Sequence, residues 1–437
     1  MSAFKQFQEY YDQYEDFKRN LKGKDVPWVS QIRENAFKDF QKIGFPSKSN
    51  EAWKYTNITP LIEKKFDPCV ASSHGVVAQE FVSKFSYPGF QSDALVFIDG
   101  VWAPELSHLS SLPDGCYVGS LSQAFLDKPE LVKKYLNLSS HSEVNAFTAL
   151  NASFMHEGVL MIVPENCRVQ KPLHLLYIAT EASKGKSVYF KNTIVLEKKS
   201  EASVVETYAS THGHEYLHNT VTSIKLNEMA TLQHVRVQRE GEGAFHFNNL
   251  DVELNLKSNY SAVFITVGGG LTRQDINVCF KGEGARAEMN GVFHPRRTQH
   301  VDYHVVVDHA IPRCTSQQLF KGIVQDEATG IFDGKIFVRK DAQSTNASQT
   351  NRNLLLSQKA KVYSKPHLEI YADDVKCTHG SSTGQLDEQA LFYMRSRGID
   401  EAKARKILTR AFAGEVIQKI KIEKLREGIE QLVFEGA

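Results

Sequence analysis

The sequence has almost no net charge and no long apolar run. Its 52 Lys and Arg residues are balanced by 51 Asp and Glu residues, so the positive excess of a nucleic-acid or anionic-membrane binder is missing. No stretch approaches the roughly 18 apolar residues of a membrane span, and the first residues contain neither a signal core nor a transit-peptide composition. We expect a cytoplasmic protein whose partners include neither nucleic acid nor membrane.

Cysteine is also scarce and widely scattered. The six cysteines form no Cys-x-x-Cys pair, so we expect reduced thiols rather than a disulfide framework. A stable iron–sulfur cluster or a structural zinc ion usually takes its thiolates from short local spacings. Any metal or sulfur chemistry of this chain is therefore expected to be transient or shared with another molecule. The cysteines are Cys69, Cys116, Cys167, Cys279, Cys314 and Cys377.

The N-terminal region, residues 1–150, has helical and mixed character. Apolar residues recur at helical spacing over 2–45, and Pro27 predicts a break between two helices there. The pattern also predicts a strand at 94–98 and one helix over 121–135.

Residues 151–385 consist of short alternating segments, and a degenerate turn with the pattern polar-polar-Ala-x-β recurs among them. Such a repeat, with about two strands per period, predicts a β-solenoid in which each coil stacks on the next. An antiparallel sandwich or barrel remains open, because degenerate turns also occur there. The recurring turns are found at 199–204, 226–232, 257–263, 282–287, 326–331 and 357–362.

The C-terminal region, residues 386–437, returns to helical spacing. Asp387 can cap a first helix that Gly398 ends, and two further helices are expected over 401–420 and 422–434.

One motif resembles the zinc-protease pattern, in which two histidines one helical turn apart bind zinc and a glutamate acts as base. Here the residues are His214, Glu215 and His218. Because 219–224 has strand composition, a strand would separate the two histidines by about 13 Å. A zinc metalloprotease is therefore a minor alternative.

A second group of candidate ligands lies in 294–309. In an extended strand, His300, Asp302, His304 and Asp308 would share one face, and imidazole with carboxylate suits iron or zinc. The favoured interpretation is a solvated or hydrogen-bonded polar face. The sequence leaves its role open.

The third group is Cys377 and His379, which project to the same side of an extended chain. Thiolate and imidazole together suit soft or borderline metals and sulfur transfer, and a structural Cys beside a capping His is equally compatible. The stretch 330–335 is one residue short of a phosphate-binding loop and continues as a strand. We expect no nucleotide to be bound by this chain.

Four stretches closely resemble the SufB/SufD family of iron–sulfur cluster assembly proteins, and the SufD branch in particular. They are 367–380, 387–399, 44–46 with 51–56, and 334–338 with 343–349. The resemblance implies a mainly β fold: a right-handed parallel β-helix core flanked by helical N-terminal and C-terminal regions. The solenoid pattern predicts the same core independently.

The resemblance further implies a non-catalytic scaffold subunit that pairs with SufB, binds the ABC-type ATPase SufC and serves apo iron–sulfur proteins indirectly. By motif match, His379 and its neighbour Cys377 would be transient ligands for iron or a nascent cluster at the SufB contact. The helical segment 386–420 would contact SufC. An isolated chain is expected to pair with itself through the same sheet edge. A carbohydrate-active hydrolase or lyase is the alternative from another class, since β-helices often act on polysaccharides.

Overall fold

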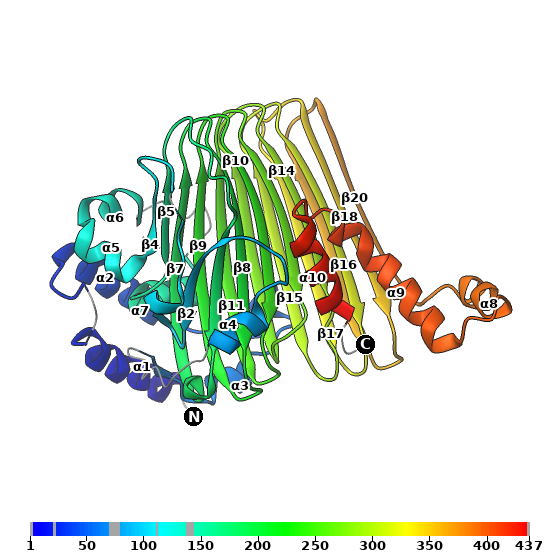
Figure 1. Cartoon of the computed structure of the whole chain (residues 1–437), viewed down its shortest axis with the longest axis horizontal. Helices are drawn as coiled ribbons and strands as arrows, with labels where there is room; N and C mark the ends of the chain where they lie inside the picture. The colour runs from blue at the N-terminus through cyan, green and yellow to red at the C-terminus, as the bar shows by residue number, and fades with distance from the viewer. Residues whose placement is uncertain (1–2, 21–22, 70–78, 111, 137–143, 435–437) are drawn as a thin grey trace.

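Two parallel sheets wind around a common interior and form a β-solenoid (Figure 1). The computed structural model describes residues 3–20, 23–69, 79–110, 112–136 and 144–434. From β5 onward the strands alternate between the two sheets, so each coil contributes one strand to each sheet. The mainly β solenoid expected from the sequence is confirmed, and the antiparallel alternative is excluded because neighbouring strands of successive coils pair in parallel.

The first sheet runs from β4 at one end to β19 at the other. Its only antiparallel pair among the described residues is β4 with β5, and the short β1 (Asp67–Pro68) pairs with β7. Its strands in spatial order are β4 (Tyr117–Ser120), β5 (Val159–Val163), β7 (Lys186–Leu196), β9 (Tyr216–Leu226), β11 (Ala244–Leu254), β13 (Leu271–Phe280), β15 (His300–His309), β17 (Thr329–Val338) and β19 (Lys361–Ile370).

The second sheet runs from β3 to β20 and begins with the antiparallel pair of β2 and β3. The strand expected at 94–98 is β2. The strands in spatial order are β3 (Val101–Trp102), β2 (Asp93–Ile98), β6 (Leu173–Ala179), β8 (Glu201–Ser210), β10 (Thr231–Arg239), β12 (Asn259–Thr266), β14 (Arg286–Phe293), β16 (Thr315–Val324), β18 (Thr345–Leu355) and β20 (Val375–Gly384).

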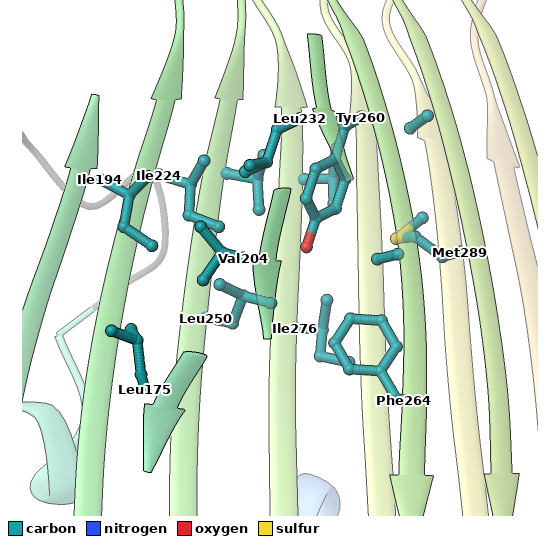
Figure 2. Close-up of a cluster of buried hydrophobic side chains, with 14 of the residues drawn as sticks. Leu175, Ile194, Val204, Ile224, Leu232, Leu250, Tyr260, Phe264, Ile276 and Met289 are labelled. Carbon is teal, nitrogen blue, oxygen red and sulfur yellow. The ribbon is translucent and has the colours of Figure 1, made fainter. Parts of the chain in front are cut away.

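Alternation along each strand fills the interior. Every second side chain points inward, and parallel register stacks it on its counterpart in the next coil, as in the column of Val204, His234 and Ala262. Figure 2 shows the apolar part of this interior, where Leu250 and Ile276 of one sheet face Tyr260 and Phe264 of the other. Removal of these side chains from water, at about 25 cal/mol per Å², stabilises the stack.

The turns lie on two different edges of the solenoid, whereas the sequence pattern predicted one repeat for all of them. On the edge that leads from the first sheet to the second, Lys199, Met229, Lys257 and Arg313 adopt φ values of 54°, 59°, 52° and 60°. Gly284 has the same role at φ 68°, where only glycine lacks the steric cost. The turns at 326–331 and 357–362 lie on the opposite edge, between β16 and β17 and between β18 and β19. The assignment of all six turns to one repeat was therefore wrong, although the solenoid that it predicted is confirmed.

Helices of the N-terminal region pack against the solenoid near β7 and β9 (Figure 1). Pro27 begins α2, and Gly44, at φ 66°, follows its end, so the expected break between two helices is confirmed. The single helix expected over 121–135 is wrong, because Pro129 cannot donate a main-chain hydrogen bond and begins a separate helix. These elements are α1 (Ala3–Lys18), α2 (Pro27–Ile43), η1 (Glu51–Trp53), α3 (Thr59–Ile62), α4 (Gln79–Phe85), η2 (Pro104–Leu106), α5 (Leu121–Asp127), α6 (Pro129–Leu136) and α7 (Ala146–Phe154).

Three C-terminal helices follow β20: α8 (Glu388–Ser396), α9 (Glu401–Ile417) and α10 (Glu423–Phe434). As expected, Asp387 caps α8 by accepting from the Gln389 N–H. Figure 1 shows α9 and α10 over the outer face of the second sheet, where Ile417 and Ile429 share a buried cluster with outward side chains such as Val263. Within the described part of the chain, no helix is both long and apolar enough to cross a membrane.

Candidate functional site

The last coil leaves the solenoid open at one end. In the described part of the chain, β19 pairs only with β17, and β20 pairs only with β18. Each of these ten-residue strands therefore presents one free edge of main-chain donors and acceptors. The two edges lie together at the far end of the stack in Figure 1. Two open edges, each the last strand of a parallel sheet, could pair with the strands of another β structure.

Both predicted ligands lie on β20. Cys377 is partly buried against a small cluster that includes Ile336 and Ala347. Burial raises the pKa of the Cys377 thiol, and a hydrogen bond involving the Ala347 backbone opposes this shift. His379 is exposed. Since the two residues are two positions apart in one strand, the expected common side is confirmed by the strand assignment.

His379 ends an interior column. Its register partner on β18 is Gln349, whose partner on β16 is Gln318. The two glutamines are buried, and Gln349 Nε2 donates to Gln318 Oε1 at 3.2 Å. Because register is kept, His379 faces the same way as these interior side chains, but no further coil of the described chain covers it. The imidazole therefore stands at the mouth of the solenoid interior.

This pair offers an incomplete ligand set. Thiolate sulfur and imidazole nitrogen suit iron and other borderline or soft metals. Among the described residues, no group of three or more ligating side chains includes either Cys377 or His379. These two side chains alone do not make up the full ligand set of a metal ion or cluster.

The C-terminal segment 386–420 extends this end of the molecule. Figure 1 shows α8 projecting beyond the solenoid, away from both sheets. Its Phe392 and Tyr393 side chains are 73% and 61% exposed, whereas Leu391 packs with Ala404 of α9. One face of α8 thus secures the helical hairpin, and the other leaves two large aromatic rings in solvent.

The polar face expected in 294–309 is a hydrogen-bonded one. Asp302 is buried, accepts from Arg273 Nη1 at 2.8 Å and from Thr56 Oγ1 at 2.5 Å, and lies 3.0 Å from His304 Nε2. Burial alone would raise the pKa of Asp302, but His304 and Arg273 lower it below its ordinary range. No three-ligand metal group occurs at this face in the described chain. The contacts tie the N-terminal segment to the first sheet.

The zinc-protease alternative has no geometric support. His214 and Glu215 lie in the loop before β9, and His218 lies within β9, so the helix that this mechanism requires is replaced by loop and strand. The two histidines join different groups: His214 with Glu181 and His212, and His218 with Glu240 and His246. The stretch 330–335 lies within β17, as expected, and lacks the loop-to-helix geometry of a phosphate site.

Sequence reasoning missed a polar network inside the solenoid. Glu206 accepts from Arg236 Nη1 at 2.6 Å and from Tyr208, while His234 lies 2.9 Å from the carboxylate. Burial alone would raise the pKa of Glu206, but the charge of Arg236 and these hydrogen bonds lower it to about 2. Arg236 Nη2 also lies 3.2 Å from His246 Nε2. The available signal was alternation, which places His234 and Arg236 on the same face as the buried Leu232.

Comparison with known proteins identifies the family. The family model described as "SUF system FeS cluster assembly, SufBD core domain" matches residues 177–412, and the model described as "SufBD protein N-terminal region" matches residues 4–175. The chain belongs to the SufBD family of iron–sulfur cluster assembly proteins. The family predicted from four short stretches is thus confirmed, and so is membership of the SUF system.

Several SufBD relatives are similar over nearly the whole chain. An iron–sulfur cluster assembly SufBD family protein of Synechocystis is 30% identical over 92% of this chain and 89% of its own length. The iron–sulfur cluster assembly protein SufD of Escherichia coli is 29% identical over 89% of this chain and 88% of its own length. SufD of Bacillus subtilis is 23% identical over 94% of both chains.

Proposed function

We propose that this SufBD chain is a non-catalytic, SufD-like scaffold subunit of a cytoplasmic assembly complex. It pairs with a SufB-like subunit, binds a SufC-like ABC ATPase and contributes a ligand to iron or a nascent cluster at the subunit interface. Iron and sulfide are cargo in this proposal, and apo iron–sulfur proteins receive the product. The chain itself binds no nucleotide.

The observation that carries the proposal is the position of His379 on a free strand edge. The edges of β19 and β20 can extend their ladders into a partner of the same solenoid type. Such a junction would cover the exposed His379 and bring ligands of the second subunit to it. The two ligands of this chain would then become part of a complete set, with Cys377 supplying sulfur beside the imidazole nitrogen.

The SufC contact is assigned to 386–420. The exposed aromatic rings of Phe392 and Tyr393 give α8 an apolar surface at its outer side. Beside α9, a cavity of about 550 Å³ is lined by Ile407 and Phe434 together with basic side chains such as Lys406 and Arg410. Apolar surface next to positive charge suits a protein partner with a complementary acidic rim.

The test is anaerobic cluster assembly by the three-subunit complex, with iron and sulfide assayed after purification. His379→Ala should lower both contents strongly while leaving SufC binding intact. His367→Ala is the matched control, because His367 is exposed on β19 of the same coil but faces the opposite way from the interior. Equal iron and sulfide in both variants would remove His379 from the site. Failure to co-purify with SufB-like and SufC-like subunits would overturn the scaffold role itself.

A further inference from the structure

Three potential ligands meet on the edge that leads from the second sheet to the first. Glu181 lies in the short helix η3 (Glu181–Ser183) after β6, and His212 and His214 lie one coil later, in the loop between β8 and β9. Coil stacking brings these turns together, as the hydrogen bond from Gly185 N to Glu215 O shows. One ligating atom from each of the three residues lies within 4.8 Å of the others. The cluster is separate from Cys377 and His379.

The spacing within this cluster is too wide for hydrogen bonds. Glu181 Oε2 lies 3.6 Å from His214 Nδ1 and 3.7 Å from His212 Nδ1. With metal–ligand bonds of about 2.0–2.2 Å, two ligands of a tetrahedral ion lie roughly 3.3–3.6 Å apart. Both distances are thus close to the edge of a metal tetrahedron.

The hydrogen bonds of Ser183 fix the tautomer of His214. The 2.8 Å contact to the Thr180 carbonyl and the 2.9 Å contact to His214 Nε2 are both hydrogen bonds at once only when Ser183 Oγ donates to the carbonyl and accepts from Nε2. In the neutral imidazole, Nδ1 then carries the lone pair. That atom is buried and has no hydrogen-bond partner among the described residues, while the whole side chain is only 8% exposed. The lone pair of His214 Nδ1 thus faces the carboxylate of Glu181. Both groups donate electron pairs, so a cation between them would be bound by both.

The surroundings hold the cluster in place and leave it accessible. Asp99 accepts from the Thr180 N–H at 2.7 Å and from its hydroxyl, which fixes the start of η3 next to Glu181. The Glu181 and His212 side chains are 63% and 53% exposed. The Thr211 hydroxyl, 2.7 Å from His212 Nδ1, also lies 3.5 Å from the Ala179 carbonyl and can turn toward it. An ion could therefore enter from solvent without a rearrangement of the backbone.

The buried group of similar composition behaves differently. His218 Nδ1 and His246 Nδ1 lie 3.0 Å and 2.7 Å from the two oxygens of Glu240, which are direct hydrogen-bond distances. The same carboxylate accepts from Tyr216 and Gln238 at 2.8 Å and 2.9 Å. Both oxygens of Glu240 thus already accept hydrogen bonds from neighbouring side chains, whereas Glu181 lies beyond hydrogen-bond distance of His212 and His214.

From these contacts we infer that Glu181, His212 and His214 form a surface site for a divalent first-row transition metal. Two imidazoles and one carboxylate are suited to Zn²⁺ and Fe²⁺, and three protein ligands leave a position open to water or to another molecule. Ser183 is a positioning residue, because it orients the ring of His214 through Nε2. The inference is independent of the function proposed above.

The test is titration of the chelator-treated chain with Zn²⁺, followed by calorimetry, and with Co²⁺, followed by its visible absorption. The chain should bind one ion at this site, and Co²⁺ should give the spectrum of a site with nitrogen and oxygen ligands. Because changes in the partners of metal ligands already cost about 10–100-fold in affinity, Glu181→Gln and His214→Ala should each weaken binding by at least about a hundredfold. Anaerobic titration with Fe²⁺ in the same way shows which of the two metals the site prefers.

Two comparisons make the outcome decisive. His367→Ala should leave this binding event unchanged, since His367 is an exposed histidine on β19 that belongs to neither candidate site. Glu181 is mostly exposed, so Glu181→Gln tests the site even if His214→Ala impairs folding. A wild-type chain that binds neither Zn²⁺ nor Fe²⁺, or a Glu181→Gln variant with unchanged affinity, would overturn the inference.

Discussion

Lys321 of β16 donates through Nζ to the main-chain carbonyl of Phe412 in α9 at 2.8 Å. The lysine is only 3% exposed, and its ammonium group lies 4.6 Å from the centre of the Phe412 ring and pairs with Glu415. A buried charge that is satisfied by one helix fixes that helix on the outer face of the second sheet. The C-terminal helices are thus attached by a polar contact as well as by apolar packing.

Replacement of this lysine should loosen α9. Lys321→Met removes a charged hydrogen bond, which costs about 1.5–3 kcal/mol, and should speed proteolysis and amide exchange in α9 and α10. Lys419→Met is the matched control, because Lys419 pairs with Glu288 on the same face but is 44% exposed, and such pairs contribute about 0–1 kcal/mol. Equal exchange in the two variants would contradict the role of Lys321.

The interior pair of Glu206 and Arg236 should be essential for stability. Glu206→Gln leaves the buried guanidinium without its counter-charge, so the free energy of unfolding should fall by about 3–5 kcal/mol in a urea titration. Lys359→Met removes an exposed partner of Glu327 and should change it by less than about 1 kcal/mol. If the first change is as mild as the second, the buried pair is not held as described.

Buried histidines should make the fold sensitive to acid. Burial lowers the pKa of His174, His246 and His309 from 6.5 to about 4. Below about pH 6.5 these histidines bind protons in the unfolded chain but stay neutral in the folded chain. Their contribution to the free energy of unfolding is therefore fully present above that pH and declines toward pH 4. The urea midpoint should fall across this window, and His309→Gln should flatten the decline. A midpoint that stays constant between pH 7 and pH 4.5 would be inconsistent with neutral buried rings.

Two glycines should respond in opposite ways to alanine. A Cβ at Gly291, in β14, would overlap with the ring of Phe320 in the solenoid interior, so Gly291→Ala should destabilise by about 1–3 kcal/mol. Gly414, in α9, has open space around it, and Gly414→Ala should stabilise by up to about 1 kcal/mol. Thermal unfolding of the two variants checks both signs, and an equal response would show that Phe320 yields without cost.

The open end of the solenoid should make the isolated chain self-associate. At micromolar concentration, sedimentation velocity should show a dimer, because uncovered strand edges pair readily. Ser381→Lys places a charge on β20, where Ser381 lies 2.7 Å from Ser364 of β19, and should shift the equilibrium toward monomer. A monomeric wild-type chain under these conditions would count against docking at this edge.

Features that depend on neighbouring residues could be predicted from the sequence. Pro27, Asp387 and Gly398 mark helix ends because capping and proline geometry act within one turn. Alternation of apolar and polar residues is also a local pattern, and it predicted two strands per coil. Pro129 carried an equally local signal against a single helix over 121–135, and that signal was overlooked.

Features that depend on coil stacking could not be predicted in this way. The turns at 326–331 resemble those at 257–263 in composition, and only strand pairing shows that they lie on opposite edges. Glu206 meets Arg236, and Glu181 meets His214, because residues about one coil apart become neighbours in register. The common face of Cys377 and His379 followed from alternation, but the exposure of His379 follows from where the stack stops.

The open coil also restricts what can join it. Strands in a ladder repeat at about 4.8 Å and keep their direction, so a continuing molecule must supply two edges with that spacing, separated by the width of the coil. Proteins with bulged, strongly bent or single edge strands fail this requirement before any side chain is compared. A partner that continues the solenoid is therefore selected first by the geometry of its backbone, before any contact with the exposed His379 is compared.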